Sequence, residues 1–149
     1  MTQPAAGDNI NVSDILKALN RRIGTTTGDT DGTSQSYAAE VAIESVTVSV
    51  VAGRTYRVRY IFHTQTTTTG NTLLTRVRAG TIAGTQITYT NAVSLTTIQT
   101  FIIEADWTAS VTGNQTFTAT AIRTAGSTNS QFRGAVGQPR SLTVEYAYG

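Results

Sequence analysis

Few residues in this sequence could perform acid, base or metal chemistry. His63 is the single histidine and there are no cysteines, so a thiolate site is excluded and an imidazole base or metal ligand would have to be His63. Glu104 and Asp106 lie two positions apart, which in a strand places both carboxylates on one face about 7 Å apart. Such a pair could act as acid and base or bind calcium, but surface carboxylates at this spacing are most often only solvated.

The sequence also lacks the local motifs that organise catalysis. It contains no Gly-x-Ser-x-Gly elbow, no phosphate-binding loop, no His-Glu-x-x-His helix and no calcium loop. We therefore expect no catalytic residues, no metal and no cofactor, and we do not expect an enzyme.

The arginines are stronger candidates for a binding site than the histidine and carboxylates are for a catalytic site. The basic residues are ten arginines and one lysine, a balance typical of fixed hydrogen bonds at interfaces rather than of a nucleic-acid-binding surface. Arg57 and Arg59 share one face of a predicted strand, and Arg76 and Arg78 share one face of the next. If those strands pair, four guanidinium groups form a cluster that favours an anionic or carboxylate-bearing partner. The alternative is that each arginine pairs locally with a carboxylate from the set Glu40, Glu44, Glu104 and Asp106.

Aromatic side chains near predicted strand ends form a third candidate set. Trp107, Tyr146 and Tyr148, with Tyr89, could make a platform that binds a glycan. Rings at strand ends also commonly close the core of a sandwich, and the sequence leaves both interpretations open.

The elements that must position these side chains are strands. The 149 residues fit one compact domain, and 30 of them are threonine, a β-branched residue that packs well on a pleated surface. Apolar and polar residues alternate in successive segments separated by turn residues, with a hairpin turn predicted at Ala52-Gly53. Seven or eight strands at intervals of about ten residues predict an all-β fold, either an antiparallel β-sandwich or a jelly roll. The predicted strands are 46–50, 55–63, 72–79, 85–93, 96–106, 115–123 and 141–148.

The N-terminal region carries the one helical pattern. Ser13 is a suitable N-cap and Gly24 a suitable end, so a helix of about ten residues is predicted between them. Its apolar residues recur four, three and four positions apart and form one stripe, which becomes the candidate oligomerisation or docking surface: Val12, Ile15, Leu16, Leu19 and Ile23. A helix this short is marginal in water, so the stripe must be buried against its own domain or between chains.

These patterns divide the chain into three parts. Residues 1–24 form an arm and helix, residues 25–36 a small and polar Thr/Gly linker, and residues 37–149 the β-domain. A linker of this kind lets the helix sit away from its own domain.

Several stretches resemble small virion proteins of tailed bacteriophages. The resemblance rests on the N-terminal segment from Asn11 to Ile23, the linker, and the segments 56–60, 75–81, 83–86 and 142–149. It implies a jelly-roll β-domain, often trimeric and displayed on the head or the tail of the particle. It supplies no catalytic residues.

The resemblance implies a virion structural protein, and the low charge and the lack of reactive side chains agree with that role. The leading interpretation is a capsid decoration protein that forms a symmetric homo-oligomer, a trimer by resemblance, and binds the major capsid protein or another virion protein. The alternative is a minor tail or receptor-binding protein that recognises host cell-wall glycan. No run of apolar residues approaches the roughly 18 that a spanning helix needs, and the N-terminus lacks a secretory pattern. We therefore expect no membrane or nucleic-acid partner, synthesis in the host cytoplasm, and a location on the capsid surface.

Overall fold

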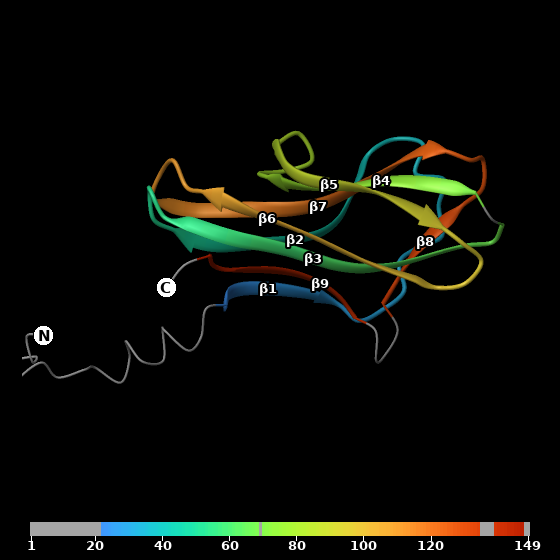
Figure 1. Ribbon diagram of the computed structural model, residues 1–149, viewed down its shortest axis with the longest axis horizontal. Coiled ribbons are helices and arrows are strands. Elements are labelled where there is room, and N and C mark those ends of the chain that lie inside the picture. The colour runs from blue at the N-terminus through green and yellow to red at the C-terminus, as the bar shows by residue number, and fades with distance from the viewer. Residues whose placement is uncertain (1–21, 69, 135–138, 148–149) are drawn as a thin grey trace, which may run out of the picture.

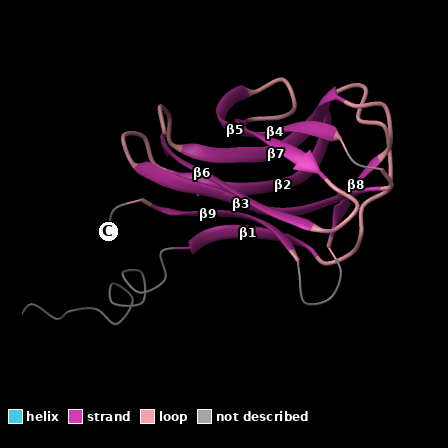
Figure 2. Cartoon of the chain, turned by 45° about the vertical axis from the view of Figure 1, so that its right-hand side comes forward, coloured by secondary structure: helices cyan, strands magenta, loops and turns pink. Residues whose placement is uncertain are grey.

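In the computed structural model the chain forms two antiparallel β-sheets that pack face to face (Figure 1). The structure describes residues 22–68, 70–134 and 139–147, and these contain nine strands. No helix occurs in this part of the chain (Figure 2). Sheet A contains β1 (Arg22–Gly28), β9 (Arg140–Tyr146), β3 (Thr55–Thr66) and β6 (Gln99–Thr108), in that order, with β8 (Ser130–Arg133) also beside β3. Sheet B contains β2 (Val41–Val50), β7 (Gly113–Ala125), β4 (Asn71–Ala79) and β5 (Thr85–Ser94).

The strand pairs are nested in the way that defines a jelly roll. Strand β1 pairs with β9, β2 with β7, β3 with β6 and β4 with β5, and every pair is antiparallel. The chain is thus one long hairpin rolled into two sheets. This topology confirms the all-β prediction and decides between its two forms in favour of the jelly roll.

Residues of alternating type build the core between the sheets. On β3, Tyr56, Val58, Tyr60 and Phe62 are fully buried, while the residues between them face outward. The facing side chains of sheet B are mostly smaller: Val46, Val48, Val50, Leu73, Val77, Phe117, Ala119 and Ala121. Because strand side chains alternate between faces, the same spacing that buries the aromatic rings places the intervening arginines outside.

The N-terminal predictions fall only partly on described residues. Four residues of the predicted helical stripe, and the helix up to residue 21, lie outside them. Ile23, the last residue of the stripe, belongs instead to strand β1 and packs against the core. Residues 22 and 23 are therefore not the end of the predicted helix that Gly24 was expected to terminate, and residues 25–28 belong to strand β1 and not to the predicted linker. Tertiary contacts decide the conformation here, because β1 pairs with β9. Gly24 also lies so close to β2 that a Cβ atom there would overlap the Val48 side chain.

The predicted turn at Ala52-Gly53 exists, but it is not a hairpin. Strands β2 and β3 lie in different sheets, so the turn carries the chain from sheet B to sheet A. Gly53 has a positive φ of 79°, which favours glycine, and its N–H donates to the carbonyl of Ala109 at 2.8 Å. The sequence identified the change of direction, whereas the choice of partner strand depends on the whole fold.

A buried ion pair connects the two sheets. Arg140 begins β9 in sheet A, Glu44 lies on β2 in sheet B, and the Arg140 Nε donates to Glu44 Oε1 at 2.9 Å. The two side chains are only 8% and 9% exposed. The Arg140 Nη1 also donates to the carbonyl oxygens of Thr30 at 2.9 Å and Phe132 at 3.0 Å. A buried guanidinium needs such partners, because each unpaired charge or donor would carry a large desolvation cost.

Replacement of Glu44 by glutamine should destabilise the domain strongly, because it leaves Arg140 buried without its counter-charge. We expect the free energy of unfolding to fall by about 3–5 kcal/mol. Urea denaturation followed by the fluorescence of Trp107 measures the change. A matched control is Glu104→Gln in the exposed pair with Arg59, whose side chains are 42% and 45% exposed, and it should cost less than about 1 kcal/mol. Equal small effects at both sites would contradict the central role of the buried pair.

Candidate functional site

The outer face of sheet A carries a ladder of cross-strand ion pairs between β3 and β6. Arg57 Nε lies 3.0 Å from Asp106 Oδ1, and Arg59 Nε lies 2.8 Å from Glu104 Oε2. The partners stand directly opposite each other in the strand register. The two carboxylates singled out as candidate acid, base or calcium ligands are therefore each paired with a guanidinium. The described residues also contain no group of three or more His, Cys, Asp or Glu side chains that could hold a metal ion.

His63 continues the same ladder as a structural residue. Its Nδ1 lies 2.8 Å from the hydroxyl oxygen of Thr100, the residue opposite it in register, and its side chain is buried. Burial lowers the pKa of His63, and the nearby Arg140 lowers it further, against a hydrogen bond with the backbone of Pro139 that raises it. The environment thus favours the neutral imidazole.

The outer face of sheet B carries one carboxylate held between two guanidinium groups. Glu40 Oε2 lies 2.8 Å from Arg76 Nη1, and Glu40 Oε1 lies 2.9 Å from Arg78 Nε. The hydroxyl of Thr120 donates to Glu40 as well, and Arg78 Nη1 donates to the carbonyl of Gly84 at 2.9 Å. Burial raises the pKa of Glu40, but the hydrogen bonds from Arg78, Thr120 and Arg76 outweigh burial and lower it to about 2. The charges of this cluster sum to +1.

The predicted cluster of four guanidinium groups does not form. Strands β3 and β4 lie in different sheets, and both direct their apolar residues inward. Their arginines therefore occupy opposite outer faces of the sandwich. The alternative of local pairing is confirmed for Glu40, Glu104 and Asp106. The remaining carboxylate of that set, Glu44, pairs with Arg140 instead.

The aromatic candidates do not share one exposed surface among the described residues. The rings of Trp107 and Tyr146 both lie beside the buried ring of Tyr56, with centroids 6.3 Å and 5.5 Å away, and both pack against the core. Tyr89 is exposed on β5, in the other sheet. Tyr148 lies outside the described residues. Trp107 and Tyr146 thus close one end of the core, and binding of a glycan by this set stays a prediction.

One end of the sandwich contains the start of β1 (Figure 1). We term it the docking end, because the predicted docking stripe leads into β1 in the sequence. Two apolar residues are exposed at this end. Val51 in the β2–β3 turn is 47% exposed, and Val111 in the β6–β7 connection is 65% exposed. The two loops are joined by a hydrogen bond from the Ala52 N–H to the Thr112 hydroxyl at 3.0 Å. Strand β1 begins here with Arg22, beside the last residues of β9.

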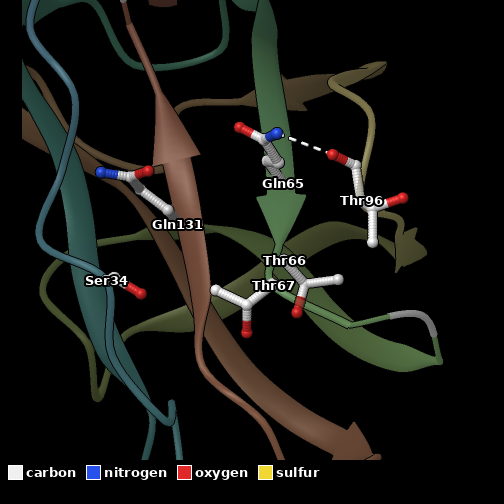
Figure 3. Close-up of a pocket in the computed structure, with 6 residues that line it drawn as sticks. All are labelled: Ser34, Gln65, Thr66, Thr67, Thr96 and Gln131. Atoms are coloured by element: carbon white, nitrogen blue, oxygen red, sulfur yellow. Dashed lines mark hydrogen bonds between the residues drawn. The ribbon is translucent and has the colours of Figure 1, made fainter.

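A polar pocket, drawn in Figure 3, lies at the end of β3, which is the opposite end of the sandwich. It has a volume of about 360 Å³, and we call it the distal pocket; it is lined by Ser34, Gln65, Thr66, Thr67, Thr96 and Gln131. Tyr56 near the docking end and Thr66 at the pocket lie ten positions apart on β3, which corresponds to about 33 Å. The lining comes from the β1–β2 connection, the end of β3 with the residue that follows it, the β5–β6 connection and β8. Sequence reasoning missed this pocket, since no local pattern brings four such segments together.

The Glu40 cluster should make stability depend on acid pH. The pKa of Glu40 is about 2 in the folded chain against an ordinary value of 4.5. Folding is therefore favoured by ionised Glu40 above about pH 4.5, and that contribution of about 3 kcal/mol is lost as the pH falls towards 2. In Glu40→Gln, urea denaturation should show a flatter dependence on pH in this interval, and Thr120→Val should be intermediate. An unchanged slope in Glu40→Gln would contradict this assignment.

Comparisons with known proteins describe the fold and do not place the chain in a family. No protein-family model matches the sequence, and no curated protein matches it. Among solved structures, the chain is similar to a CBM4 structure at 11% identity, with 76% of this chain and 64% of that chain covered and a TM-score of 0.46. It is also similar to a structure of infectious bursal disease virus, Gx strain, at 13% identity, with 84% of this chain and 36% of that chain covered and a TM-score of 0.49.

A third similarity is to a family 35 carbohydrate binding module from Clostridium thermocellum. The identity is 15%, 83% of this chain and 98% of that chain are covered, and the TM-score is 0.41. The chain thus spans less than two thirds of the CBM4 and viral chains but nearly all of the third. The solved structures that are similar to this chain thus include a carbohydrate binding module and a virus.

Proposed function

We propose that this chain is a structural protein of a bacteriophage virion, a decoration protein that attaches to the capsid head through its docking end. The observation that carries the proposal is the position of β1. This strand starts at the end where Val51 and Val111 are exposed, and the segment immediately before it carries the apolar stripe of Val12, Leu16 and Leu19. The chain segment that carries this stripe therefore enters the described domain at the end where the two valines are exposed. An apolar stripe on a helix this short needs a partner surface, which is what a docking role would supply.

The state of the titratable groups supports a structural role over a catalytic one. The carboxylates of Glu40, Glu104 and Asp106 are in ion pairs, and His63 is buried against Thr100. Groups fixed in this way hold strands together and are poorly placed to exchange protons with a substrate. We therefore propose that the protein is not an enzyme.

The partner at the docking end would be the major capsid protein or another virion protein, together with further copies of this chain. Copies related by symmetry can bury their apolar stripes against one another around an axis, and we propose a trimer. The alternative role, a minor tail protein that binds cell-wall glycan through Trp107, Tyr146 and Tyr148, has less support. Trp107 and Tyr146 use their rings to close the core.

The double substitution Leu16→Asp with Leu19→Asp tests the docking role in the full-length chain. We expect the variant to keep the unfolding free energy of the wild type but to lose self-association and co-sedimentation with purified phage heads. Analytical ultracentrifugation and sedimentation with heads that lack the protein measure the two effects. A matched control, Lys17→Gln with Ala18→Asp, changes the net charge by the same two units off the stripe and should bind as the wild type does.

Two results would contradict this role. One is a double variant that still associates and sediments with heads. The other is a loss of several kcal/mol in the unfolding free energy of a monomer, on the scale of two buried leucines, because it would mean that the stripe packs on its own domain.

A further inference from the structure

The distal pocket is lined by uncharged polar side chains alone. Two glutamines, three threonines and one serine form its wall, and no charged or aromatic residue is among them (Figure 3). Hydroxyl and amide groups each offer both donors and acceptors. A volume of about 360 Å³ lies within the range of pockets that bind small molecules.

Hydrogen bonds within the protein fix the two amides of this wall. Gln65 Nε2 donates to the carbonyl of Thr96 at 2.7 Å, which joins β3 to the β5–β6 connection (Figure 3). Gln131 Nε2 donates to the carbonyl of Gly32 at 2.8 Å, and its Oε1 accepts from Arg133 Nη1 at 2.9 Å. Because both amides are already oriented, little conformational entropy would be lost when a ligand binds.

Other polar atoms of the wall are left for a ligand. Among the described residues, the hydroxyls of Ser34, Thr67 and Thr96 and the Oε1 of Gln65 have no hydrogen-bond partner in the protein. Ser34, Thr67 and Thr96 are exposed. Three separate segments thus bring free hydroxyl and carbonyl groups to the rim of one pocket.

We propose that the distal pocket binds a neutral sugar residue of a glycan. An ionised ligand would find no counter-charge in the lining, and an apolar ligand would cover the hydroxyls without satisfying them. A pyranose ring carries several hydroxyls that each donate and accept, which matches the free groups of the wall. This binding goes beyond the docking role, since the pocket lies at the end away from the docking end, and it would leave the sugar site accessible on an attached protein.

Titration of the full-length, isotope-labelled protein with neutral monosaccharides tests the proposal by NMR. The probes are methyl α-mannopyranoside, galactose, glucose and N-acetylglucosamine, each up to about 50 mM, with N-acetylneuraminic acid and inorganic phosphate as charged comparisons. We expect at least one neutral sugar to shift the amide signals of the pocket residues with a Kd of about 1–10 mM, typical of weak binding by few hydrogen bonds. The charged probes should bind more weakly than that sugar.

Isosteric substitutions then locate the site. Thr67→Val and Thr96→Val each remove one hydroxyl of the lining and should weaken binding about tenfold, whereas Thr68→Val, an exposed neighbour outside the lining, should have no effect. No shift with any neutral sugar, equal binding of the charged probes, or unchanged binding in both lining variants would overturn the proposal. Sedimentation with phage heads does not depend on the distal pocket. A failure of sugar binding can therefore be distinguished from a failure of the docking role.

Discussion

The Arg140 guanidinium holds together four parts of the chain that meet between the two sheets. It belongs to β9 in sheet A, its charge is neutralised by Glu44 in sheet B, and its remaining donors reach Thr30 before β2 and Phe132 on β8. The last two segments are also joined directly, because the Gly32 N–H donates to the carbonyl of Phe132 at 2.8 Å. Ser34 and Gln131 of the distal pocket lie on these same segments. The shape of the distal end thus depends on one buried charge and its partners.

The jelly-roll topology gives the molecule two distinct ends. In nested antiparallel pairs, alternate connections fall at opposite ends of the strands. The β2–β3 and β6–β7 loops therefore lie at the same end as the start of β1, while the β1–β2 and β5–β6 connections lie at the other end and contribute to the distal pocket. The ion-pair ladder on sheet A and the Glu40 cluster on sheet B brace the faces between them. Such a module can attach by one end and present the other, which is what a displayed virion protein requires.

The sequence predicts the parts of this structure that repeat locally. The alternation from Tyr56 to Phe62 identifies β3 and its buried face, and the paired arginines on each strand mark the outer faces. Strand β1 could not be found in this way, because Ile23 is its one large apolar residue and its conformation depends on pairing with β9. The partner of Glu44 could not be predicted from the sequence either. The fold buries this carboxylate against Arg140, which is nearly a hundred residues away in the sequence. The distal pocket could not be predicted for the same reason, because residues far apart in the sequence form its lining only after the two sheets have packed together.

The orientation of the protein on intact phage particles tests the two-ended account most directly. A cryo-electron microscopy reconstruction of heads, at a resolution that places the jelly roll, would show which end touches the shell. We expect density for this chain at many symmetry-related positions on the head, with the start of β1, Val51 and Val111 towards the shell and the distal pocket towards solvent. Density found at the tail tip alone, or a jelly roll attached by its distal pocket, would contradict it.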